Sequence, residues 1–218
     1  MIPRIKICCI SSIEEARIAI DAGASALGLV GPMPSGPGVI TDELIYRIAK
    51  TVPPPVATFL LTSETSVFEI IQHHQRTQTN TIQLVDALAK GSYTQLREAL
   101  PGIKLVQVIH VRDERSVDEA IQISEQVDAI LLDSGNPKLP VKELGGTGRI
   151  HDWVLSRRIR DSVKTPVFLA GGLTPENIRE AIETVQPFGI DLCSGVRTSG
   201  KLDKAKLDLF FTEVFKNS

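Results

Sequence analysis

Short apolar runs alternate with helix-like segments along the whole chain, and no other feature of the sequence constrains the fold as strongly. Eight of these runs have the length and apolar content of parallel strands that are buried on both faces. They cover residues 5–10, 26–30, 56–61, 81–85, 104–111, 129–133, 166–170 and 189–193. Capping residues and apolar side chains at helical spacing follow the runs. Eight strand–helix units in succession predict an α/β fold of the (β/α)8 barrel (TIM barrel) type.

The main competing fold is a doubly wound open sheet. Such a sheet would need fewer strand–helix units in this length, and no dinucleotide-binding glycine pattern follows the first strand. The chain also shows no linker and no shift in composition between its parts. We therefore expect one barrel domain over residues 1–218.

Two helix predictions carry specific details. Thr174 is placed to cap a helix that has Pro175 at its first helical position. A helix over residues 63–75 should carry His73 and His74 as a pair on its surface.

Composition and charge exclude several classes of protein. A net formal charge of −2, with Lys and Arg scattered along the chain, gives no general reason to bind nucleic acid. No apolar segment is long enough to span a bilayer, and residues 1–10 lack the features of a signal peptide. The 3 cysteines, two of them adjacent, make a poor disulfide framework and favour a reducing compartment. We expect a cytoplasmic protein with no nucleic-acid or membrane partner.

Glycine turns follow the last two predicted strands. Gly171 and Gly172 end the seventh strand, and Ser194 and Gly195 end the eighth. Glycine lets phosphate oxygens approach backbone amides, and the loops after the last two strands of a barrel often bind phosphate. Two tight turns without a ligand are the alternative, but the pairing on neighbouring strands favours a phosphate site.

Candidate catalytic side chains also lie at strand ends. Cys8 and Cys9 lie at the end of the first strand, and strand alternation predicts that only one of them faces inward. Asp133 ends the sixth strand, where an unpaired carboxylate would be costly in a core. The alternatives are a small buried hydrophobic residue for each cysteine and a helix cap for Asp133. A thiol and a carboxyl facing each other beside a phosphate site are suited to proton transfer on a sugar phosphate.

No metal site is expected, because the 4 histidines lack zinc-ligand spacing with the cysteines.

Several motif blocks resemble those of the phosphoribosylanthranilate isomerase family, and they follow one another in the family's order between residues 6 and 211. The blocks are Lys6-Ile7-Cys8, Glu14-Glu15-Ala16, Ala22-Gly23-Ala24, Gly28-Leu29-Val30, Leu131-Leu132-Asp133-Ser134, Gly145-Gly146-Thr147-Gly148, Asp152-Trp153, Leu169-Ala170-Gly171-Gly172-Leu173, Pro175-Glu176-Asn177, Asp191 and Ser194-Gly195-Val196.

The resemblance implies an aldose–ketose isomerase of tryptophan biosynthesis that performs an Amadori rearrangement on a phosphoribosylated amine. Cys8 would be the general base and Asp133 the general acid. No cofactor is implied, and the partner would be a small phosphosugar substrate bound by a monomer or homodimer. The phosphate would be held by Gly145, Gly146, Gly171, Gly172, Ser194 and Gly195.

The sequence departs from the family pattern at four places. Cys9 replaces a glycine after the catalytic cysteine, and Pro37 replaces the arginine that pairs with the anthranilate carboxylate. Val85 stands where the fourth strand normally ends in histidine, and Arg197 replaces a glutamate. Arg197 is therefore a candidate substrate-proximal cation that approaches from another direction.

Three hypotheses follow from this mixture. The first is an isomerase acting on phosphoribosylanthranilate. The second is the same chemistry on another phosphorylated aminosugar, since the arginine is missing. The third is a barrel that has lost catalysis and binds a phosphorylated metabolite, which the retained Cys8 and Asp133 argue against.

Overall fold

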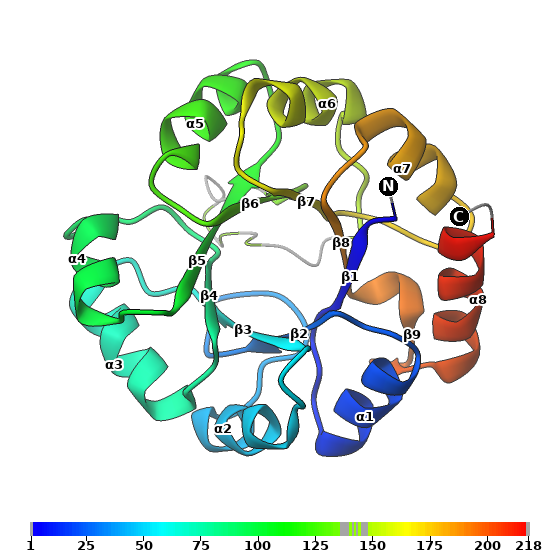
Figure 1. The fold of residues 1–218 in the computed structure, drawn as a ribbon, viewed down its shortest axis with the longest axis horizontal. Coiled ribbons are helices and arrows are strands. Elements are labelled where there is room, and N and C mark those ends of the chain that lie inside the picture. The colour runs from blue at the N-terminus through cyan, green and yellow to red at the C-terminus, as the bar shows by residue number, and fades with distance from the viewer. Residues whose placement is uncertain (1, 136–139, 141, 143, 145–147, 217–218) are drawn as a thin grey trace.

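Eight parallel strands form a closed barrel in which each strand is hydrogen-bonded to the next and β8 returns to β1 (Figure 1). This computed structural model describes residues 2–135, 140, 142, 144 and 148–216. The strands are β1 (Arg4–Ile7), β2 (Ala26–Val30), β3 (Ala57–Thr62), β4 (Thr81–Leu84), β5 (Lys104–His110), β6 (Ala129–Asp133), β7 (Val167–Leu169) and β8 (Gly189–Leu192). The predicted (β/α)8 class is confirmed, and most strands end one to three residues from the predicted positions.

Helices surround the barrel on its outside (Figure 1). They are α1 (Ile13–Asp21), α2 (Asp42–Thr51), α3 (Val67–Thr77), α4 (Tyr93–Ala99), α5 (Arg115–Ser124), α6 (Trp153–Ser162), α7 (Ile178–Val185) and α8 (Lys204–Phe215). A short two-stranded sheet of β9 (Arg197–Thr198) and β10 (Lys201–Leu202) lies between β8 and α8.

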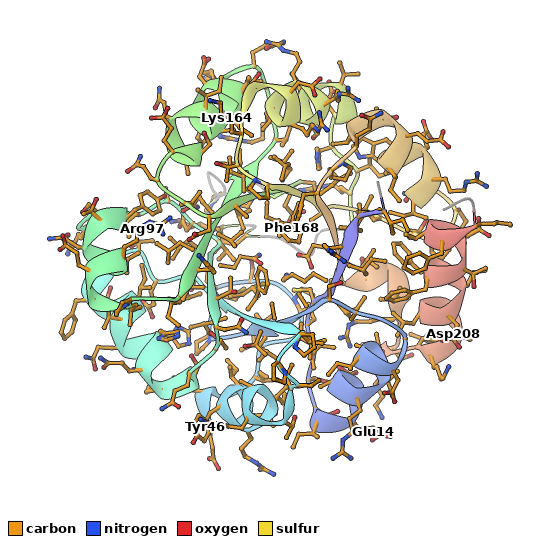
Figure 2. The ribbon with its side chains drawn as sticks, viewed as in Figure 1. Glu14, Tyr46, Arg97, Lys164, Phe168 and Asp208 are labelled. Atoms are coloured by element: carbon orange, nitrogen blue, oxygen red, sulfur yellow. The ribbon has the colours of Figure 1, made fainter. Side chains whose placement is uncertain are left out.

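The strand sequences build two separate apolar cores. Alternate residues such as Ile5 and Ile7 belong to a core that also contains the inner faces of the helices. Residues of the other parity fill the barrel itself, and Phe59 and Phe168 meet there edge to face with ring centroids 6.1 Å apart. Figure 2 shows Phe168 inside the ring of strands. Barrel packing of this kind leaves room for a site only at the strand ends.

The start of α7 differs from the prediction. The helix begins at Ile178 with Asn177 as its N-cap residue, and Pro175 lies in the turn before it. The side chain of Asn177 accepts a hydrogen bond from the Thr174 amide at 2.9 Å and donates one to the Gly172 carbonyl at 2.9 Å. These bonds stabilise a separate turn, so the helix starts three residues later than its capping signal suggests.

The predicted surface pair of histidines is also wrong. His73 and His74 are only 2% and 7% exposed. His73 contacts the Thr62 hydroxyl through Nδ1 at 2.8 Å and Asp42 through Nε2 at 3.1 Å, while His74 donates to the Thr79 carbonyl at 2.8 Å. Because each ring finds polar partners inside the α3 interface, both can be buried.

Within the described part of the chain, none of the helices has the length and apolar character needed to cross a membrane.

Candidate active site

A cavity lies at the carboxyl ends of the strands. Its volume is about 670 Å³ when the open space at the entrance is included. Five of the predicted site residues line it: Cys8, Asp133, Gly171, Gly172 and Ser194. Gly195 is not among the lining residues, and Gly145 and Gly146 lie outside the residues that the structure describes. The barrel therefore brings together residues that are more than 180 positions apart in the chain.

Cys8 enters the cavity from the end of β1. Its amide donates to the Leu192 carbonyl at 2.7 Å, which continues the β1–β8 pairing by one residue. A side chain at Gly28 would place its Cβ 2.7 Å from the Cys8 sulfur and 3.0 Å from Lys6 Nζ. The glycine on β2 thus leaves the space that the Cys8 thiol occupies, next to the Lys6 ammonium.

Cys9 lines the same cavity, so the prediction that only one of the two cysteines faces inward is wrong. Strand alternation does not apply because β1 ends at Ile7 and Cys9 has a left-handed backbone with φ of 62°. The hydrogen bond with Cys193 raises the pKa of the Cys9 thiol and lowers that of the Cys193 thiol. Three thiols therefore meet at this rim, and Cys9 is held in its neutral form.

Asp133 ends β6 and is almost fully buried. Burial raises the pKa of its carboxyl, and the nearby Asp191 carboxylate acts in the same direction. The Ser134 amide donates to Asp133 Oδ1 at 2.7 Å and opposes part of that shift. A carboxyl that retains its proton at higher pH than an exposed aspartate is suited to act as an acid.

A buried ion pair that includes Asp191 of the cavity wall was not singled out from the sequence. Lys6 is fully buried, and its Nζ lies 2.9 Å from Asp191 Oδ1 on the neighbouring strand. Burial lowers the pKa of Lys6, but the Asp191 carboxylate outweighs this effect and the net shift is upward. The sequence does contain a signal for this pair, because each of the two otherwise apolar strands carries one charged residue at an inward position. The register of β1 against β8 places Lys6 next to Asp191.

The turn after β7 has a backbone that favours glycine at two successive positions. Gly171 and Gly172 have φ values of 84° and 63°, in the region that favours glycine. A Cβ at Gly172 would lie 2.7 Å from the Arg149 carbonyl carbon. Among the described residues, none accepts a hydrogen bond from the amides of these two glycines. Toward the described residues, the amides of the turn after β7 are therefore unpaired, and this turn lines the same cavity as Ser194 at the end of β8.

Arg197 does not lie where a substrate-proximal cation is expected. It is absent from the residues that line the cavity, and its side chain is directed to the Glu15 carboxylate and to backbone carbonyls. Burial in an ion pair with Glu15 explains this placement.

Apolar side chains line the cavity on the side of the β2, β3 and β4 loops. They are Val30, Met33, Pro37, Leu61 and Val85, and Leu144 adds an apolar side chain from the segment between β6 and α6. The charged residues of the lining are Asp133 and Asp191, and no cationic side chain is among the described residues that line it.

Comparison with known proteins identifies the family. A family model for N-(5'phosphoribosyl)anthranilate (PRA) isomerase matches residues 5–213. The chain belongs to this family. The predicted family is confirmed, and with it the predicted aldose–ketose isomerase class.

Two curated phosphoribosylanthranilate isomerases from archaea are similar over nearly their whole length. The enzyme of Methanocella arvoryzae is 33% identical over 212 residues, which cover 97% of this chain and 95% of that protein. Isomerase 2 of Methanosarcina mazei is 36% identical over 206 residues, which cover 94% and 90%.

Solved phosphoribosylanthranilate isomerase structures have the same fold. The Thermotoga maritima enzyme superimposes with a TM-score of 0.80 at 30% identity, covering 98% of this chain and 99% of that one. A second structure of such an isomerase, in complex with reduced 1-(o-carboxyphenylamino)-1-deoxyribulose 5-phosphate, has a TM-score of 0.78 at 29% identity, covering 98% and 99%.

Proposed function

We propose that this chain catalyses the Amadori rearrangement of N-(5'-phosphoribosyl)anthranilate, with Asp133 as general acid and Cys8 as general base. Asp133 donates a proton to the ribose ring oxygen, and the C–O bond breaks to give an open-chain imine. The Cys8 thiolate then removes the proton from the adjacent sugar carbon, and the resulting enolamine becomes the ketone. The shared cavity of the two side chains is the observation that carries this assignment.

The phosphate of the substrate is assigned to the turns after β7 and β8. Gly171 and Gly172 offer amide groups there, and Ser194 adds a hydroxyl. Gly195, Gly145 and Gly146 complete the proposed set on the family resemblance. Anchoring one end of the sugar keeps the reacting carbon between Cys8 and Asp133, which lowers the entropic part of the barrier.

The remaining assignments follow from the same reaction. Acid–base chemistry of this kind requires no cofactor or metal. The ligand is a small phosphosugar, as in the related isomerase solved with a ribulose phosphate analogue. We further propose one barrel domain over residues 1–218 and a cytoplasmic location. The oligomeric state is a monomer or a homodimer, since a related Thermotoga maritima isomerase is dimeric.

The test is a fluorescence assay for consumption of phosphoribosylanthranilate by the purified protein. Cys8→Ala and Asp133→Asn should each lower kcat by about 10²- to 10⁴-fold, because each removes a proton-transfer group. Asp161→Asn on the outer face of α6 is the carboxyl control and should stay within about tenfold of the wild type. Unchanged turnover in the Cys8 and Asp133 variants rejects the assignment.

A second substrate is favoured by the apolar wall of the cavity. With Pro37 in place of the family arginine, no described cation faces the carboxylate of anthranilate. Loss of such a charge-assisted contact costs about 2–3 kcal/mol, or roughly a hundredfold in affinity. Another phosphorylated aminosugar with an uncharged aromatic group would avoid this loss. Turnover of that analogue at a higher kcat/KM than phosphoribosylanthranilate would select the second substrate.

A further inference from the structure

Arg197 is hydrogen-bonded to the backbone next to the Cys8 thiol. Its Nη2 donates to the Cys9 carbonyl at 2.6 Å and to the Cys8 carbonyl at 3.1 Å. The Glu15 carboxylate accepts from Nη1 at 3.1 and 3.3 Å and from Nη2 at 3.2 Å. We propose that Arg197 and Glu15 are positioning residues that fix the Cys8–Cys9 peptide so that the thiol of Cys8 stays aimed into the cavity. The inference rests on the proposed function, in which Cys8 is the base.

The backbone conformation of Cys9 explains why these hydrogen bonds from Arg197 are needed. Its φ of 62° lies in the left-handed region, where the Cβ of any residue other than glycine crowds the backbone. The chain carries cysteine at this position, so the local conformation is strained. Relaxation of Cys9 toward negative φ would rotate the peptide that joins it to Cys8 and would move the thiol. One guanidinium can hold both carbonyls only while they converge, which the left-handed turn provides.

The Arg197–Glu15 pair is itself held by hydrogen bonds to other segments of the chain. Glu15 on α1 also accepts from the Ser11 amide at 2.9 Å and from the Leu202 amide on β10 at 2.8 Å. Arg197 Nη1 donates to the Gly200 carbonyl at 3.0 Å. Glu15 and Arg197 are only 8% and 9% exposed.

The pair is charged at neutral pH. Burial favours the neutral acid, but the hydrogen bonds from Arg197 outweigh it and hold the pKa of Glu15 below its usual value. Burial would also lower the pKa of Arg197, and the Glu15 carboxylate reverses that effect. A planar guanidinium with five donors can satisfy a carboxylate and two carbonyls together, which an ammonium cannot do with the same geometry.

The position of Arg197 behind the cavity separates this role from substrate binding. The side chain reaches the reaction only through Cys8 and Cys9, since it does not line the cavity. A variant should therefore change the rate of proton abstraction more than the affinity for substrate.

The experiment is a double-mutant cycle between Arg197 and Cys9, read by steady-state kinetics on phosphoribosylanthranilate. Arg197→Met should lower kcat about 10- to 100-fold with KM within about threefold, and Arg197→Lys should recover part of the loss. In a Cys9→Gly background, the loss from Arg197→Met should shrink by at least about fivefold, because glycine adopts the left-handed backbone without strain. Urea unfolding of the same four proteins gives a second reading of the coupling.

Arg157→Met is the matched control. Arg157 on α6 also bonds a carboxylate, Asp161 at 2.7 Å, and a backbone carbonyl, that of Thr184 at 3.4 Å. It lies away from the cavity lining, so kcat should be unchanged.

Each outcome decides the inference. The positioning role is wrong if the wild type is active and Arg197→Met lowers kcat by less than about threefold. It is also wrong if Arg197→Met lowers kcat by the same factor in the wild-type and Cys9→Gly backgrounds. If Arg197→Met does not fold, Arg197→Lys takes its place in the cycle with the same criterion. If the wild type does not turn over this substrate, the proposed function fails, and the coupling in urea unfolding alone then supports or rejects the role of the Arg197 hydrogen bonds.

Discussion

At the scale of single residues, the barrel depends on an ion pair in its interior. Lys6 is fully buried and pairs with Asp191 at 2.9 Å, while its ammonium also lies 5.2 Å from the centre of the Phe59 ring. Removing one partner leaves the other charge unpaired in a low-dielectric interior. Lys6→Met should therefore lower the free energy of unfolding by about 3–5 kcal/mol.

The double variant Lys6→Met/Asp191→Asn is the control, because it removes both charges. Its cost should be smaller than the sum of the two single variants by at least about 1 kcal/mol, measured by urea unfolding at constant pH. Costs that simply add would show that the two charges do not depend on each other.

At the scale of elements, the turn between β7 and α7 depends on a close backbone approach. A Cβ at Gly172 would lie 2.7 to 2.9 Å from backbone atoms of Arg149 and Ile150, in addition to its φ of 63°. Backbone atoms cannot move aside as a flexible side chain can, so Gly172→Ala must push the turn away from the segment before α6. We expect KM to rise more than about tenfold and stability to fall by about 1–3 kcal/mol.

Gly102→Ala is the matched control for this turn. Gly102 has a φ of 87°, but a Cβ there would meet nothing within 4 Å. It should show the cost of backbone strain, about 1 kcal/mol, without a change in KM. An equal rise of KM in both variants would mean that the phosphate does not sit on the β7–α7 turn.

The alternation of apolar runs and helical segments was enough to predict the barrel, because each apolar run is a local feature. The barrel in turn predicts a site at the carboxyl ends of its strands. The late start of α7 came from a local turn closed by Asn177, whereas the failures at Cys9 and at the two histidines came from contacts between distant segments. Cys9 lines the cavity together with Cys8 because the backbone leaves strand geometry there, in a left-handed turn whose carbonyl accepts a hydrogen bond from Arg197, 188 residues away. His73 is buried because Asp42 and Thr62 offer partners that no local pattern reveals.

At the scale of the whole molecule, acid should destabilise the fold in two stages. Burial lowers the pKa of His151 to about 4 and also lowers that of His73. The unfolded chain therefore binds protons near pH 6.5 that the folded chain rejects, and stability falls as pH drops from 6.5 towards 4. Burial raises the pKa values of the paired carboxylates Glu15 and Asp128, but hydrogen bonds outweigh it and hold both pKa values below normal. Below that pH range these carboxylates become protonated, and further stability is lost.

The first stage can be assigned to one ring. His151 bonds the Ser156 hydroxyl through Nε2 at 2.7 Å, and its Nδ1 is buried without a hydrogen-bond partner among the residues described. His151→Gln removes the titration and keeps a polar side chain, so it should flatten the pH dependence of the unfolding free energy between pH 6.5 and 4. The difference in slope should approach about 1 kcal/mol per pH unit, below the one-proton limit of about 1.4 because the ring is partly exposed. If urea titrations give the wild type and the variant the same dependence of unfolding free energy on pH, other groups control the loss of stability in acid.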